Sequence, residues 1–288
     1  MKRFLSPVSL TFGVMFSFSA VCLAQDSSRP RPEFTVGIKA WDTSWQSYLP
    51  STVAGFSSNG QPIIGEVVNS VEGSKKVEAL PTFTVRYDRY FVSAGYARFS
   101  SDFRVSQSPA TLPDFRNLIA FRQDHITRRE TDINAGYFVL PGLAFTLGYK
   151  NGREERDTRT GLSPSSSPLL DAKLNVWLVG ALAAFEIQNG LSAYGQFGYG
   201  VGKTKTDLSE GFGAFAGERI RSHAKYLVNE VGLAYTLPFE VSWLRRTSVA
   251  LGYRSQTIKQ NVPSVISGET RKLRDVKDGF VLSLNATF

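Results

Sequence analysis

The chain has 288 residues, a hydrophobic share of 42% and a formal net charge of +8. Its mean hydropathy is −0.14, and after the first two dozen residues no apolar run approaches the roughly 20 residues of a membrane-spanning helix. The single cysteine, Cys22, lies in the N-terminal segment. This excludes disulfides, thiolate nucleophiles and cysteine metal sites from the chain after residue 24.

The N-terminal segment has the pattern of a secretory signal peptide. A positive start, residues 1–3, is followed by an apolar stretch, residues 8–20, and by small residues ending at Ala24. We therefore expect cleavage of residues 1–24, with Gln25 as the first mature residue. A lipoprotein with Cys22 acylated is the alternative, but Val21 precedes the cysteine where a small residue is needed. Residues 25–288 are expected to form one domain.

Ten later segments alternate apolar residues with small or polar residues, with the period of two that is typical of strands. In the first of them, Phe34 and Val36 share one face, and Thr35 and Lys39 share the other. The predicted strands are residues 33–45, 80–88, 90–103, 130–140, 143–150, 173–185, 191–203, 223–235, 247–257 and 278–288.

The connections between these strands differ in length. Residues 88–89, 141–142 and 189–190 carry tight-turn signals, whereas residues 46–79, 104–129, 151–172, 204–222 and 258–277 are long and are expected to be extracellular loops. Short turns at one end and long loops at the other are typical of transmembrane barrels. The sequence thus predicts an all-β, transmembrane antiparallel up-and-down β-barrel of about ten strands, with eight or twelve as alternatives. A soluble β-sandwich is disfavoured because the polar faces carry mainly Gly, Ala, Ser and Thr.

The closing strand carries the expected assembly signal. Phe280, Leu282, Leu284 and Phe288 share one face, with Val281 as the exception on the other. A C-terminal strand of this kind with a final aromatic residue resembles Gram-negative outer-membrane β-barrel proteins. The resemblance implies an outer-membrane location and four partners: outer-membrane lipid, lipopolysaccharide, the barrel-assembly machinery and periplasmic chaperones. We expect this strand to pair with residues 33–45.

Charged residues on the predicted inner face are the candidates for the lumen. They are Lys39, Arg86, Asp132, Lys150, Glu230 and Arg254. The turn between their strands brings Glu230 and Arg254 close enough for an ion pair. Charges that pair with one another would close the barrel, because buried charges are tolerated only when they are paired. The alternative is a narrow hydrophilic channel, since wide pores need about sixteen strands.

The predicted loops are basic, and a planar guanidinium binds phosphate well. We expect them to contact lipopolysaccharide phosphates, with surface adhesion or ligand binding as the alternative function and no role in binding nucleic acid. The basic residues are Arg122, Arg128, Arg129, Arg153, Arg156, Arg159, Arg271, Lys272, Arg274 and Lys277.

Enzymatic activity is not expected. Outer-membrane proteases of the omptin family carry acidic pairs and a histidine at the mouth, but Asp124-His125 does not match that family's motif. Outer-membrane acyl hydrolases use a serine and a histidine on lipid-facing positions, but Ser222 and His223 are adjacent and must face opposite sides of a strand. Neither a metal site nor a cofactor is expected.

Overall fold

The computed structural model describes residues 31–56, 62–105, 122–160, 167–209, 216–238, 242–263 and 270–288. The predicted signal peptide lies outside these residues. The described strands are β1 (Glu33–Phe56), β2 (Pro62–Glu72), β3 (Lys76–Tyr87), β4 (Tyr90–Val105), β5 (Arg122–Leu140), β6 (Leu143–Thr160), β7 (Ser167–Gln188), β8 (Leu191–Leu208), β9 (Arg219–Thr236), β10 (Arg246–Pro263) and β11 (Thr270–Thr287). Within these residues no helix is long and apolar enough to cross a membrane.

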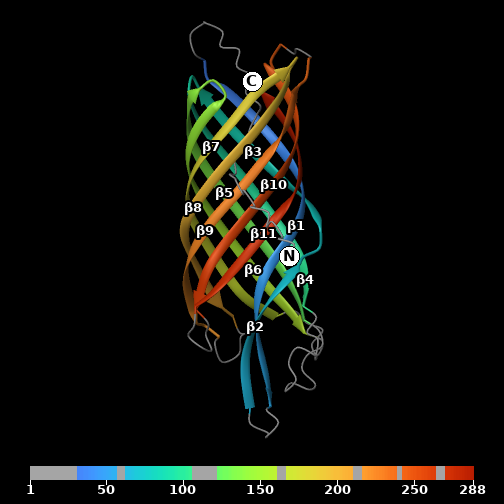
Figure 1. The fold of residues 1–288 in the computed structure, drawn as a ribbon, viewed down its shortest axis with the longest axis vertical. Coiled ribbons are helices and arrows are strands. Elements are labelled where there is room, and N and C mark those ends of the chain that lie inside the picture. Colours follow the sequence, from blue (N-terminus) through green and yellow to red (C-terminus); the bar gives the residue numbers. More distant parts are fainter. Residues whose placement is uncertain are drawn as a thin grey trace, which may run out of the picture.

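The sheet closes on itself as an antiparallel barrel (Figure 1). Strands β3 to β11 pair in chain order, and β1 closes the ring by pairing with β3 on one side and β11 on the other. Its register with β11 runs from Thr35↔Thr287 to Ser47↔Asp275. The predicted all-β barrel of about ten strands is confirmed for the described residues, and so is the pairing of the closing strand with the first strand.

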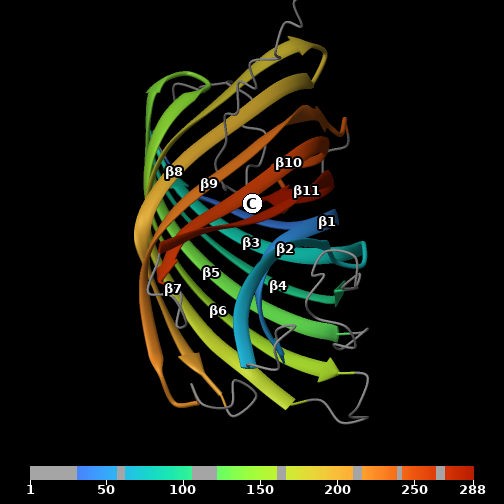
Figure 2. The same ribbon diagram turned by 60° about the horizontal axis from the view of Figure 1, so that its bottom comes forward.

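One strand, β2, does not belong to the ring. β2 follows the far part of β1, from Gln46↔Glu72 to Phe56↔Pro62, and so continues beyond the point where β3 begins. The resulting β1–β2 hairpin projects past the barrel rim at the end opposite to the C-terminus (Figures 1 and 2). The sequence analysis assigned this segment to a loop.

Tight turns lie at the predicted positions 88–89, 141–142 and 189–190. At the end that holds Phe288, the Asn189-Gly190 turn has φ of 45° and 82°, the pair of positive angles that a type I′ hairpin needs. This is the periplasmic end by the rule that short turns are periplasmic. At the other end the strands are longer than predicted, because residues 151–160 and 167–172 are paired strand and not loop. The outer face is polar there, so alternation of apolar residues could not reveal it.

The outer wall carries an apolar band between two aromatic girdles. Residues of the band, such as Leu233, Leu251 and Leu284, are 50–58% exposed. A band of this kind is unfavourable in water and matches the hydrocarbon of a bilayer, so the barrel is a transmembrane one. The periplasmic girdle contains Tyr87, Tyr90, Tyr137, Tyr235, Trp243 and Phe288, and the outer girdle contains Tyr96, Tyr149, Trp177, Tyr199, Tyr253 and Phe280.

One seam interrupts the ladder of the wall. The ladder of β3 and β4 runs from Thr82↔Gly95 to Tyr87↔Tyr90. Towards the extracellular end, β4 next bonds backbone to backbone with the residues that precede β3, where Ser74 N–H donates to the Asp102 carbonyl (3.2 Å). The ladder ends beside Pro81, which has no N–H to donate. We call residues 76–81 and 96–101 the β3–β4 seam. It starts at the outer girdle and runs toward the extracellular end.

Candidate functional site

An ion cluster centred on Glu230 lies inside the barrel. Lys39 reaches across from β1 and donates to both carboxylate oxygens (2.7 and 2.8 Å). Arg254, directly opposite Glu230 on β10, donates at 2.9 Å, and the Tyr194 hydroxyl donates at 3.0 Å. The Arg254 guanidinium also covers the ring of Trp41 at 4.9 Å. The predicted Glu230–Arg254 ion pair is confirmed, and we call these five residues the Glu230 cluster.

A second ion cluster lies further along the interior. Lys150 on β6 donates to Glu130 (3.0 Å) and Asp132 (3.3 Å), which alternate on the inner face of β5. Gln256 from β10 donates to Glu130 from the other side (3.0 Å). The Lys150 ammonium lies 5.3 Å from the centre of the Tyr226 ring. Two donor side chains and two carboxylates are therefore paired in a buried position, which is the condition for tolerating charge there.

Aromatic rings fill the interior beside these clusters. Trp41 meets Phe99 edge-on at 5.7 Å, and Trp45 meets Phe103 edge-on at 5.2 Å. The Lys277 ammonium, 1% exposed as a residue, lies 3.8 Å from the Trp45 ring centre and 3.3 Å from that of Phe99. Cation–π contact of this kind is strongest where water is excluded.

These contacts close the described interior. Inward-facing side chains of a water-filled pore would be exposed, but many large inward side chains here are almost fully buried: Trp41, Tyr226, Phe99, Phe103, Lys150, Lys277, Ile126, Leu178, Leu182 and Ile258. Five of the six lumen candidates, Lys39, Asp132, Lys150, Glu230 and Arg254, lie buried inside. The sixth, Arg86, lies half-buried at the periplasmic rim, near Glu33 (4.0 Å) and over the ring of Phe138 (4.8 Å).

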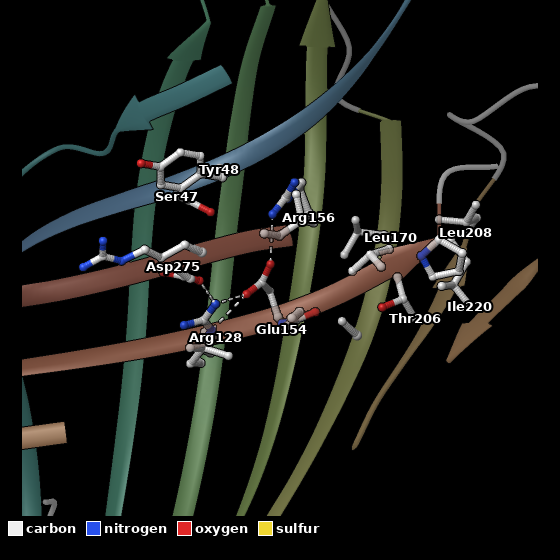
Figure 3. Close-up of a pocket in the computed structure, with 17 residues that line it drawn as sticks. Ser47, Tyr48, Arg128, Glu154, Arg156, Leu170, Thr206, Leu208, Ile220 and Asp275 are labelled. Carbon is white, nitrogen blue, oxygen red and sulfur yellow. Dashed lines mark hydrogen bonds and ion pairs between the residues drawn. The ribbon is translucent and has the colours of Figure 1, made fainter. Parts of the chain in front are cut away.

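A cavity of about 120 Å³ opens at the extracellular mouth (Figure 3). Its floor is charged: Arg128 lies between Glu154 and Asp275 and forms ion pairs with both, and Arg156 donates to Glu154 at 3.1 Å. Arg274 adds a further cation to the lining. The walls are mainly apolar, with Leu170, Ala172, Leu208, Ile220, Ile258, Val262, Pro263 and Leu273, and they also include Ser47, Tyr48, Thr206 and Gln260. We call this the mouth cavity.

The sequence analysis missed this floor because it assigned its residues to loops. Arg128, Arg156 and Lys277 were expected to contact lipopolysaccharide, but all three are buried inside the barrel. These residues could be recognised by extending the period-two alternation of inward and outward residues beyond the membrane band. Along β5, Asp124, Arg128 and Glu130 fall on the same inward face as the predicted Asp132.

The two adjacent pairs that were considered as catalytic candidates, Asp124-His125 and Ser222-His223, each have their side chains on opposite faces of a strand. Asp124 is fully buried while His125 is exposed, and Ser222 is buried while His223 is exposed. Each pair thus faces opposite sides of the wall, which confirms the expectation for Ser222 and His223. Among the described residues, no group of three histidines, cysteines or carboxylates is placed to hold a metal ion.

Comparison with known proteins gives likeness at the level of the fold. No protein-family model matches the chain, and no curated protein matches its sequence. The outer membrane protease OmpT from Escherichia coli matches with a TM-score of 0.43 and 11% identity, over 94% of this chain and 99% of that one. OprG from Pseudomonas aeruginosa gives 0.33 and 14% over 90% and 97%. Neisserial surface protein A gives 0.30 and 15% over 88% and 95%.

By their names, two of these are outer-membrane proteins and the third is a surface protein. The closed antiparallel barrel, its exposed apolar band and its two girdles make this chain a transmembrane β-barrel. The class-level prediction of an outer-membrane type of β-barrel is therefore confirmed.

Proposed function

We propose that the protein is an outer-membrane ligand-binding barrel whose mouth cavity holds a small amphiphile with an anionic head. The observation that carries this proposal is a cavity open to the extracellular side above an interior that side chains fill. A solute that enters the mouth meets the charged floor of the cavity and, beneath it, the buried second ion cluster around Lys150. The function is therefore binding and not passage, in contrast to the narrow channel that the sequence left open.

The lining of the mouth cavity suggests the chemistry of the ligand. Eight apolar residues in the walls favour an aliphatic or aromatic body. Three arginines face two carboxylates at the floor, so one positive charge is in excess. A carboxylate, sulfonate or phosphate head would accept hydrogen bonds there, and arginine is suited to bidentate contact with such groups.

We further propose that the outer surface above the girdle anchors the barrel among lipopolysaccharide molecules. Exposed cations there support this: Arg98, Arg129, Arg153, Lys173, Lys203, Lys205, Arg219, Arg221, Lys225 and Lys259. Anionic phosphates of the outer leaflet are their natural partners. We thus assign the contact with lipopolysaccharide to the outward faces of the strands and not to the loops for which it was predicted.

Binding of octanesulfonate to the full chain in nanodiscs tests the mouth cavity, with empty nanodiscs as the reference. Calorimetry should detect saturable binding to the wild type. Ala172→Trp fills the cavity and should abolish the binding, whereas Ala40→Trp, on the exposed outer face of β1, should retain it. Equal binding by wild type and Ala172→Trp, or none by either, would contradict the proposal.

Planar-bilayer recording tests the closed interior separately. The wild-type barrel should show no discrete conductance steps, because its inward side chains exclude water. Steps of reproducible size from the wild-type protein would show a channel and would overturn the assignment to binding.

A further inference from the structure

A serine, a histidine and an aspartate meet on the outer wall, at the extracellular side of the outer girdle. The Ser100 Oγ lies 3.2 Å from His125 Nε2, and His125 Nδ1 lies 2.7 Å from Asp102 Oδ1. Ser100 and Asp102 are two residues apart on β4 and so share its outer face, and His125 on β5 lies directly opposite Asp102. The side chains of His125 and Asp102 are 45% and 42% exposed.

The chemistry of the three groups fixes the direction of the hydrogen bonds. An ionised aspartate can only accept, so His125 Nδ1–H donates to Asp102. In neutral imidazole the other nitrogen is then an acceptor, so the Ser100 hydroxyl donates to Nε2. This is the arrangement of nucleophile, general base and orienting carboxylate that activates a serine. We propose that Ser100, His125 and Asp102 form a catalytic triad that hydrolyses acyl esters of anionic lipids in the outer leaflet.

The surroundings of Ser100 favour a lipid substrate. Below it on the same outer face of β4 lies Tyr96, a residue of the outer girdle. Across the β3–β4 seam, Val77 is 68% exposed on the outer face of β3, although it is apolar. Ser100 is therefore within reach of the lipid surface, with apolar side chains beside it that can contact an acyl chain.

Two arginines between the girdle and the triad favour an anionic substrate. Arg98 and Arg129 are directly opposite each other on β4 and β5, and both are exposed. Like charges in directly opposite positions repel. Glu155 on β6, on the side of β5 away from Arg98, offsets part of this repulsion at 3.6 Å from Arg129. A lipid phosphate between the two guanidinium groups would neutralise the pair and hold the ester close to Ser100.

The β3–β4 seam supplies a donor for the negative oxygen that forms during attack. Because β4 has no ladder partner in the seam, the Ser100 N–H points into it and donates to Glu78 Oε1 (3.2 Å). A carboxylate oxygen thus accepts from the backbone N–H of the nucleophile, a donor that an oxyanion could use in its place. Substrate must displace Glu78 from this N–H, so Glu78→Gln should raise the hydrolytic rate.

The reaction follows from these contacts in two balanced halves. Ser100 Oγ bonds to the ester carbonyl carbon while His125 Nε2 takes its proton. The carbon–oxygen bond to the alcohol then breaks, and the alcohol leaves with that proton. Water next gives its proton to His125 and its oxygen to the acyl carbon, and Ser100 departs and recovers the proton. The sum is ester plus water to carboxylic acid plus alcohol.

A fluorophosphonate probe and defined vesicles test the triad with the full chain in membranes. Intact-mass analysis should find one adduct, on Ser100. Ser100→Ala should abolish it, and His125→Gln should slow both labelling and hydrolysis of phosphatidylglycerol by on the order of 10³-fold. Phosphatidylglycerol should be hydrolysed about tenfold faster than phosphatidylcholine, the order of one charge-assisted hydrogen bond, and Arg98→Gln should reduce that preference.

Matched controls separate the triad from general reactivity. Ser255→Ala removes an outer-face serine on β10, and Thr127→Val removes the other hydroxyl near His125 Nε2 (3.5 Å). Both variants should keep the adduct. An unlabelled wild type that hydrolyses neither lipid overturns the proposal. Labelling that survives Ser100→Ala would show that Ser100 is not the nucleophile. Equal rates for the two lipids, with the wild type and with Arg98→Gln, would show that the enzyme does not prefer an anionic substrate.

Discussion

The Glu230 cluster inside the barrel and the Ser100–His125–Asp102 group on its wall are both networks of hydrogen-bonded polar side chains, but they differ in access to water. Lys39, Glu230 and Arg254 have side chains that are 1–3% exposed, whereas those of His125 and Asp102 are above 40% exposed. A buried network cannot meet a substrate, and breaking it leaves an unpaired charge. An exposed network contributes little to stability, and its groups remain available for reaction.

The largest effect should follow from removing the acceptor at the centre of the interior. Glu230→Ala leaves Lys39 and Arg254 buried with no carboxylate between them, and we expect a loss of about 3–5 kcal/mol in the free energy of unfolding. Denaturant titration of the folded barrel in vesicles measures it. Glu230→Gln keeps the acceptor oxygen and should lose less. A loss below 1 kcal/mol for Glu230→Ala, on the scale of an exposed ion pair, would remove the distinction between the two regions.

Placing a charge on the lipid-facing side should cost nearly as much. Leu251 is 58% exposed in the apolar band, and Leu251→Arg puts a guanidinium into hydrocarbon at a cost of about 2–4 kcal/mol near the bilayer midplane. The same titration should give a much smaller change for Lys259→Arg, which is exposed beyond the girdle on the same strand. Equal changes in the two variants would show that the band is not where we place it.

The closing strand offers an effect on assembly. Phe288 is 39% exposed and stacks on Trp243 at 5.7 Å in the periplasmic girdle, where aromatic side chains are favoured. Phe288→Asp should lower the fraction of chains that reach the membrane while those that do remain folded, as judged by the electrophoretic mobility of unheated protein. Normal insertion of this variant would contradict the assembly role predicted for Phe280, Leu282, Leu284 and Phe288.

The smallest effect on stability should come from the outer wall. Ser100→Ala removes one exposed hydrogen bond, and its free energy of unfolding should stay within about 0.5 kcal/mol of the wild type. Together with the expected loss of labelling, this would place Ser100 in function and not in structure. A loss as large as that of Glu230→Ala would instead make the triad a structural network.

Much of the interior was accessible to sequence analysis because alternation is local. Lys39 and Glu230 were assigned to the inner face from their immediate neighbours, and five of six such candidates lie buried there. Arg128, Glu154 and Asp275 were missed for the same reason. Beyond the membrane both faces of a strand can be polar, so hydrophobic alternation no longer reveals the strand. Backbone hydrogen bonds to the neighbouring strands nevertheless continue there.

The sequence by itself determined the faces of the strands, the tight turns and the pairing of the last strand with the first, since side chains alternate with a period of two wherever one face meets lipid. Only the tertiary structure decided which residues stand opposite one another. His125 meets Asp102 through the register of β4 and β5, whose ends are separated by residues 106–121. Lys39 meets Glu230 across the closed barrel. The first contact depends on the register of two neighbouring strands and the second on closure of the whole ring, and no single segment of the chain encodes either.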